Sequence, residues 1–134
     1  MLRVVDGGEL ELKDKAHIRY FDVGPYPVWF GFTTNENKFQ KELKRLGIKE
    51  DVDFVSCGKD ATAHFFEQQG KLNVIVTISG LKKRKKEEVI GLLIHEAVHV
   101  WHEICDYIGE RDPGVEISCY SIQNIAQSMI GEIN

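Results

Sequence analysis

One long segment of the chain, from Glu87 to Ile108, predicts a buried helix and constrains what the rest can fold into. Read with a helical period, it has an apolar stripe formed by Leu93, Ala97, Val100, Ile104 and Ile108 and widened by Ile90, Ile94, Val98 and Trp101. A helix that is apolar over most of its girth is a central one. Its polar exceptions fall mostly on one side: His95, Glu96, His99, His102, Glu103 and Asp106. Polar groups there cost free energy unless they are paired or bind a metal, so they indicate a functional site.

The motif His95-Glu96-Ala97-Val98-His99 lies in the middle of this segment. On a helix, His95 and His99 lie roughly 40° apart on one face and one turn apart along the axis. Both imidazoles can therefore bind one cation, while Glu96 can reach a metal-bound water. The alternative is that both are buried helix histidines with hydrogen-bond partners. The pattern favours a metal site, with Zn²⁺ as the expected ion.

A second helix is expected from about Pro113 to Gly131, with Asp112 as its N-cap and Pro113 at its first helical position. One side of it carries a polar stripe, which consists of Glu116, Tyr120, Gln123 and Gln127. Two helices joined by a short turn pack antiparallel. The stripe can then face His95 and His99.

A catalytic zinc ion takes three protein ligands and keeps one position open. Glu116, one turn into the second helix, is the preferred third ligand, although it also reads as an ordinary surface acid near a helix N-terminus. Glu110 and Asp112, on the turn, are weaker candidates. His102 lies close to His95 around the helix but about 10.5 Å along the axis, too far to share a four-coordinate ion comfortably. We expect His102 to line the cleft instead.

The first part of the chain predicts β structure with one helix. The expected elements are a hairpin over 3–12, strands over 17–21 and 28–32, a helix over 36–46 that ends at Gly47, and a hairpin over 61–67 and 71–78. Both faces of the last strand are apolar, so it should be covered on both sides. The prediction is an α+β fold over residues 1–134, a single domain whose mostly antiparallel sheet packs on the central helix and the C-terminal helix. Two roles remain open for His64: a structural or cleft-lining role, and contact with a substrate.

Composition and charge limit which binding partners and which cellular compartment are expected for the protein. The net charge is −4, and the one basic run, 82–86, is short, which disfavours a nucleic-acid binder. No apolar run is long enough for a membrane span, and the start lacks a signal-peptide core, so a cytoplasmic protein is expected. Cys57, Cys105 and Cys119 are odd in number and widely spaced, which predicts reduced, mostly buried thiols rather than a disulfide framework.

The HExxH motif followed by Glu116 on the next helix resembles the gluzincin arrangement of zinc metallopeptidases. The segments LLIHEAVHVWHEI, IGE and PGVEISCYSIQNIAQ resemble small zincin-like proteins encoded in bacteriophages and prophages. The similarity covers about residues 60–131 and is strongest in the two motif helices. It implies a small zincin-like domain, zinc on His95, His99 and Glu116, and Glu96 as general base. It also implies the cytoplasm of an expressing or phage-infected bacterial cell.

The expected function is a zinc metallopeptidase that hydrolyses peptide bonds of a peptide or protein substrate with metal-activated water. Glu96 would take the proton of the attacking water, and Tyr120 or His102 would help to stabilise the oxyanion. In zincin-like folds, a strand placed like 72–78 binds an extended peptide by strand addition. The alternative is a non-catalytic zinc-binding module that acts through protein–protein contact. Glu96 separates the two, because a structural zinc site has no need of a general base.

Overall fold

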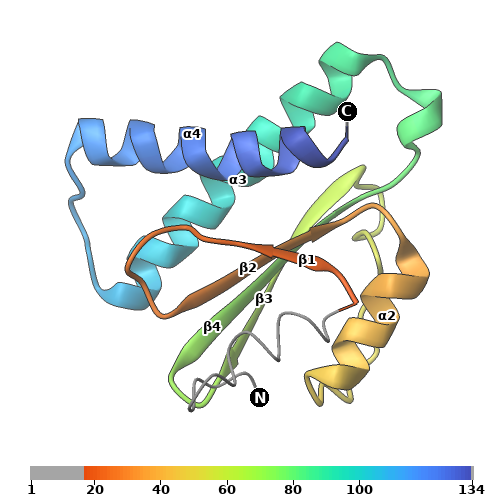
Figure 1. The fold of residues 1–134 in the computed structure, drawn as a ribbon, viewed down its shortest axis with the longest axis horizontal. Coiled ribbons are helices and arrows are strands. Elements are labelled where there is room, and N and C mark those ends of the chain that lie inside the picture. Colours follow the sequence, from red (N-terminus) through yellow and green to blue (C-terminus); the bar gives the residue numbers. More distant parts are fainter. Residues whose placement is uncertain (1–16, 134) are drawn as a thin grey trace.

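A computed structural model of the protein describes residues 17–133 (Figure 1). In chain order the elements are β1 (Arg19–Phe21), β2 (Val28–Thr33), α2 (Glu36–Arg45), β3 (Ala61–Gln68), β4 (Lys71–Ile78), a 3₁₀ turn η1 (Leu81–Lys83), α3 (Lys86–Ile108) and α4 (Val115–Glu132). The predicted α+β class is confirmed, and so are the predicted strands and helices of this region. The predicted hairpin over 3–12 lies outside the described residues. Within 17–133, no helix combines the length and apolar character that a membrane crossing needs.

The sheet is mixed, with the strand order β1-β2-β4-β3. β1 and β2 are antiparallel, β2 and β4 are parallel, and β4 and β3 form an antiparallel hairpin. Parallel strands need a crossover connection, and here the chain passes through α2 and β3 between β2 and β4. β4 is therefore an inner strand, whereas β1 and β3 form the two edges of the sheet.

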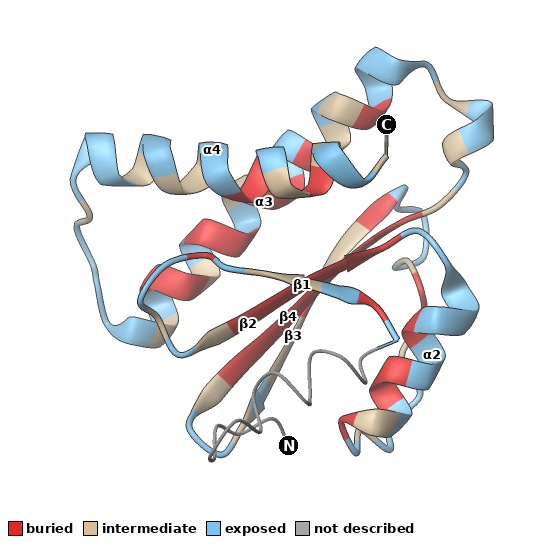
Figure 2. Ribbon diagram, viewed as in Figure 1, coloured by how far each residue is buried: buried red, intermediate tan, exposed pale blue. Residues whose placement is uncertain are grey.

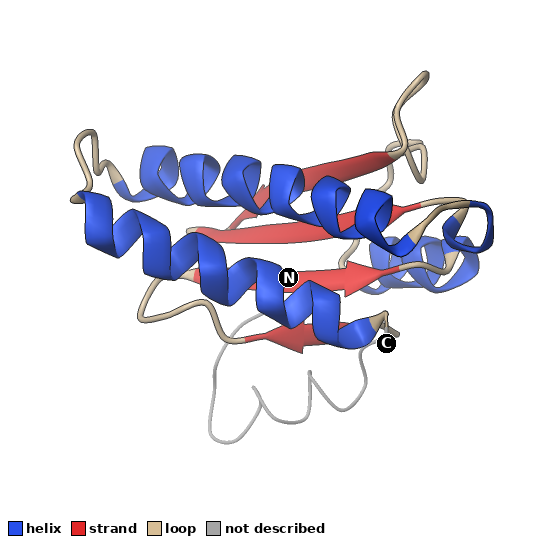
Figure 3. Ribbon diagram, turned by 90° about the horizontal axis from the view of Figure 1, so that it is seen from above, coloured by secondary structure: helices blue, strands red, loops and turns tan. Residues whose placement is uncertain are grey.

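Helices cover both faces of the sheet, so the domain has three layers. α3 and α4 lie side by side over one face, and α2 lies against the other (Figures 1 and 3). β4 supplies both cores by alternation. Val74 and Val76 pack toward α3 and α4, whereas Ile75 packs with Phe39 of α2. The central strands are accordingly buried along most of their length, as predicted for the last strand (Figure 2).

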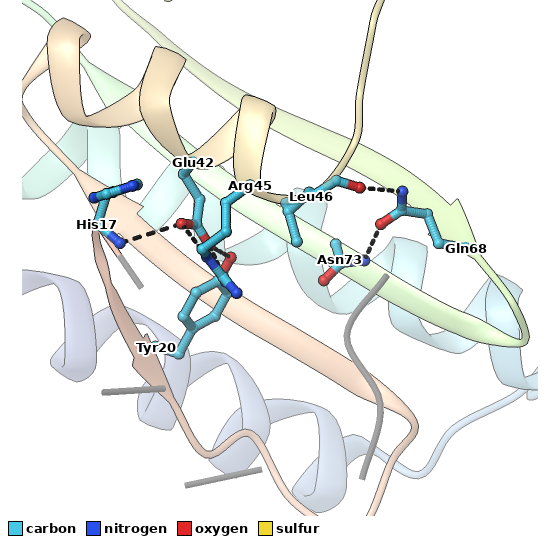
Figure 4. A network of polar contacts seen from close by, with 7 residues as sticks. All are labelled: His17, Tyr20, Glu42, Arg45, Leu46, Gln68 and Asn73. Atoms are coloured by element: carbon cyan, nitrogen blue, oxygen red, sulfur yellow. Dashed lines mark hydrogen bonds and ion pairs between the residues drawn. The ribbon is translucent and has the colours of Figure 1, made fainter. Parts of the chain in front are cut away.

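A buried ionic network fastens α2 to β1 (Figure 4). Glu42 is fully buried, and its carboxylate accepts hydrogen bonds from the Tyr20 hydroxyl at 2.5 Å, from Arg45 Nε at 2.8 Å and from the His17 backbone N–H at 3.2 Å. Arg45 Nη2 also contacts the carboxylate in an ion pair. Burial, followed by the charge of Glu42, raises the pKa of Tyr20 well above its usual value, so its hydroxyl stays protonated and keeps donating. The network satisfies a charge that would otherwise be costly to bury.

α4 packs on α3 and reaches β1 with its far end. The Trp101 indole N–H of α3 donates to Ser118 Oγ of α4 at 3.0 Å, and Arg19 of β1 pairs with Glu132 at 2.9 Å. The predicted start of α4 is wrong by two residues. Its N-cap is Gly114, not Asp112, and the Asp112 N–H donates to the Glu110 side chain at 3.3 Å within the preceding turn.

Candidate metal centre

The two histidines of the motif converge on one point. His95 Nε2 and His99 Nε2 lie 3.1 Å apart, with ring centroids 4.7 Å apart and ring planes at 70°. Two nitrogen ligands of one tetrahedral zinc ion are separated by about 3.3 Å. The pair therefore has the separation that a shared zinc ion requires. Both side chains are exposed, so the alternative of buried structural histidines is wrong.

Glu96, the residue after His95 on α3, is 6% exposed and lines a cleft together with His95. Among residues 17–133 it has no hydrogen-bond or ion-pair partner, whereas Glu42, which is also buried, has several donors. The two carboxylates therefore differ in what holds them, and that of Glu96 is left for contacts with what enters the cleft.

Glu96 and His95 line a cleft of about 470 Å³ between the beginning of β3 and the N-terminal half of α3. The other lining residues are Gly58, Lys59, Asp60, Ala61, Arg84, Glu88, Gly91 and Leu92. An ion pair braces the rim, with Arg84 Nη2 at 2.8 Å from the Asp60 carboxylate and Arg84 Nε donating to the Ser79 carbonyl at 3.1 Å. The cleft gives a substrate access to the carboxylate that has no partner.

β3 forms one edge of the sheet, and its first residue, Ala61, lines this cleft. The Asp60 carbonyl accepts from the Ser79 N–H at 3.1 Å, so the antiparallel alternation directs the backbone groups of the next residue, Ala61, away from β4. The same alternation turns Ala63, Phe65 and Glu67 outward, and no backbone hydrogen bond from residues 17–133 reaches these outward groups. The prediction that 72–78 is the strand open to a peptide is therefore wrong. That strand, β4, is paired on both sides, and the open edge belongs to β3.

The structure does not bring Glu116 together with the two histidines. Among residues 17–133, no group of three or more His, Cys, Asp or Glu side chains is arranged to hold a metal ion. Glu116 and Tyr120 are both exposed on α4, as are Gln123 and Gln127 of the predicted polar stripe. Glu116 as third ligand and Tyr120 as an aid to catalysis thus stay predictions.

His102 does not line the cleft beside His95 and Glu96, so the expectation that it lines the cleft of the site is wrong. It lines a second cleft of about 740 Å³ between α3, the 109–113 turn and α4. Cys105 lines the same cleft. Burial, with smaller contributions from the charges of Glu110 and Asp106, raises the pKa of the Cys105 thiol and disfavours the thiolate that a metal needs. All three cysteines are free, but Cys57 and Cys119 are exposed, so the prediction of mostly buried thiols is wrong.

His64 has a structural role. It is 8% exposed and lies between the rings of Phe39 and Phe66 on the α2 side of the sheet. Its Nε2 lies 3.1 Å from both the Phe54 carbonyl and Thr77 Oγ1, an arrangement in which an Nε2–H tautomer donates. It fastens the connection that leads into β3, on the face of the sheet opposite the cleft.

Sequence reasoning missed most of the cleft wall. The loop residues Gly58 to Asp60 and the pairing of Asp60 with Arg84 depend on how distant segments meet, which no local pattern predicts. Gly91 was missed as well, although a glycine inside an otherwise well-formed helix is a signal that the sequence itself carries.

Comparison of the chain with protein families, with curated proteins and with solved structures finds no match. The resemblance to gluzincins consequently rests on the motif residues themselves. Any statement about function has to come from the chemistry of the site.

Proposed function

We propose that the protein is a zinc-dependent peptidase that hydrolyses peptide bonds of peptides or proteins in the cytoplasm of the cell that makes it. The observation that carries the proposal is the combination of a converging histidine pair with a buried, unpartnered Glu96 in an open cleft. His95 and His99 would hold the zinc ion, with Glu116 as the proposed third ligand. A zinc ion held there would supply Lewis-acid activation of water and of the scissile carbonyl.

The residues of the chain would carry the proton transfers. Glu96 would accept a proton from an attacking water and return it to the amine that leaves when the peptide bond breaks. Its place in the cleft lining supports this role, because no described residue engages the carboxylate and a water that enters the cleft can reach it. Tyr120 is proposed to donate a hydrogen bond to the carbonyl oxygen as negative charge develops on it.

The edge of β3 would hold the substrate. An extended peptide that adds to the outward groups of Ala61, Ala63 and Phe65 gains backbone hydrogen bonds without requiring a particular sequence. α3 covers the adjacent part of the sheet, and the cleft lined by Ala61, His95 and Glu96 opens beside the beginning of this strand. A peptide on the edge would therefore pass the candidate metal ligands.

The test compares the native protein with Glu96→Gln and with Glu103→Gln, a control that changes another glutamate on α3. All three are loaded with zinc, checked for fold by circular dichroism and incubated with a broad peptide library read by mass spectrometry. We expect cleavage by the native protein and the control, and loss of cleavage by at least about a hundredfold in Glu96→Gln with zinc retained. Absence of cleavage by the native protein, or equal cleavage by Glu96→Gln, would refute the peptidase proposal.

A zinc-bearing interaction module is the second candidate, and one observation favours it. Val115, Ile117 and Tyr120, near the beginning of α4, are 76%, 58% and 67% exposed. Exposed apolar side chains that gather on one element are typical of contact sites. The same digest separates the two functions, because an interaction module cuts nothing in the library.

A further inference from the structure

Gly91 is an unexplained residue in the middle of α3. Glycine inside a helix costs about 1 kcal/mol relative to alanine, because the unfolded chain loses more freedom when it is ordered. Steric need does not account for it, since a Cβ built on Gly91 would meet no atom within 4 Å. The helix could carry a larger residue there without a clash, so the reason for glycine lies in the space that it leaves.

That space is part of the cleft beside the candidate metal pair. Gly91 lies one turn before His95 and lines the cleft together with Leu92, Ala61 and Gly58. Three of the ten lining residues are thus glycine or alanine, Leu92 adds an apolar surface, and the other six carry ionisable side chains. A side chain at position 91 would project into the volume that these small residues leave open.

A second observation indicates that the space receives a ligand. Glu96, which lines the same cleft, is more than nine-tenths buried and makes no hydrogen bond or ion pair with the described residues. The ion pair of Arg84 with Asp60 braces the rim at 2.8 Å, so the walls are held by the protein itself. A preformed cleft with a glycine gap in its wall and an acid that no described residue engages has the construction of a binding subsite.

We propose that Gly91 keeps this subsite open for a large side chain of a bound peptide and so sets the size preference of the protein. The inference rests on the proposed peptidase function and names the residue that selects its substrates. A peptide on the β3 edge presents alternate side chains toward α3, and one of them enters the space beside Gly91. Shortening that side chain would leave the subsite partly empty, whereas enlarging residue 91 would exclude the large side chain.

The experiment uses Gly91→Leu, with Gly131→Leu as the matched control. Gly131 lies in α4, away from the cleft, and a Cβ there also meets no atom within 4 Å. Neither substitution introduces a clash, and both should leave the fold and zinc content unchanged. Native protein and both variants are profiled with a peptide library that varies one residue at a time around each cleavage site.

We expect Gly91→Leu to lose cleavage of peptides with a large side chain at one position by about tenfold or more, and to keep cleavage of peptides with alanine or glycine there within about threefold. Gly131→Leu should match the native profile. The same profile for Gly91→Leu and native protein would overturn the inference while the peptidase function stands.

A second experiment measures peptide binding and does not depend on cleavage. The zinc-loaded Glu96→Gln protein, with and without Gly91→Leu, captures peptides from the same library, and the captured peptides are sequenced. Enrichment of large residues at one position, lost in the double variant, supports the subsite even if the native protein cuts nothing. No enrichment in Glu96→Gln, or the same enrichment in both proteins, overturns it.

Discussion

The two buried glutamates of residues 17–133, Glu42 and Glu96, should respond to the same substitution with very different changes in stability. Glu42 is 0% exposed and Glu96 is 6% exposed, so their burial is nearly equal. Glu42 accepts hydrogen bonds from Tyr20, from the His17 backbone and from two nitrogens of Arg45. Glu96 accepts none from the described residues. Replacement by glutamine removes the charge and keeps the shape, which isolates the electrostatic difference between the two sites.

The expected magnitudes follow from these contacts. Glu42→Gln loses charge-assisted bonds and leaves the Arg45 guanidinium without its counter-charge, so the free energy of unfolding should fall by about 2–4 kcal/mol. Glu96→Gln removes no hydrogen bond or ion pair with the described residues, so the free energy of unfolding should change by less than about 0.5 kcal/mol.

The assay is urea unfolding followed by circular dichroism, with a chelator present so that metal binding does not add to the stability of either protein. The slope of the transition should be the same for all three proteins, which would show that only stability has changed. If Glu96→Gln is less stable than the native protein without metal, Glu96 has a stabilising partner and the argument for a residue kept for catalysis is refuted.

Three further outcomes are expected. His95→Ala should lose bound zinc, measured by elemental analysis after dialysis, whereas His102→Ala should keep it; equal zinc in both would exclude the converging pair as the ligands. Glu116→Gln should weaken zinc affinity by about tenfold or more in a competition titration, whereas Glu110→Gln should not. Equal affinities of the two variants would show that Glu116 is a surface residue and not a zinc ligand. Burial, partly offset by the hydrogen bond to the Phe54 carbonyl, lowers the pKa of His64, so the folded state binds fewer protons than the unfolded state. The contribution of His64 to the free energy of unfolding should therefore be fully present above about pH 6.5 and be lost as the pH drops below that value. In His64→Gln the free energy of unfolding should fall less steeply over the same range. Identical pH dependence of the two proteins in urea unfolding would contradict this.

The sequence predicts the elements of the fold better than their arrangement. The apolar period of α3 and the alternation of β4 are local properties, and both elements have the expected bounds. The position of β4 inside the sheet depends on its parallel pairing with β2, forty-four residues earlier in the chain (Val28 with Leu72), and no local pattern encodes that pairing. The expectation that 72–78 would lie open to a peptide failed for this reason.

The candidate site also has a part that the sequence predicts and a part that it does not. His95 and His99 converge because helical geometry fixes residues four apart, and the sequence alone was sufficient to predict it. The burial of Glu96 and the cleft beside it depend on where β3 and the loop before it pack against α3, which is a property of the tertiary structure. The start of α4 was predicted at Pro113, whereas the helix begins at Val115 after Gly114, so the local cap signals at Asp112 and Pro113 did not decide it.

The open edge of β3 has a consequence for the behaviour of the protein at high concentration. An edge strand with free backbone groups can pair with any other strand, including the β3 of a second molecule. Apolar residues flank the free groups on both faces, and Glu67 is the one charged side chain in the strand. Natural edges are normally protected by charges, prolines or bulges, and among residues 17–133 this one has little such protection. A peptide bound along the edge would occupy the same groups, so a ligand that fits the cleft should also suppress self-association and extend the concentration range in which the protein stays monomeric.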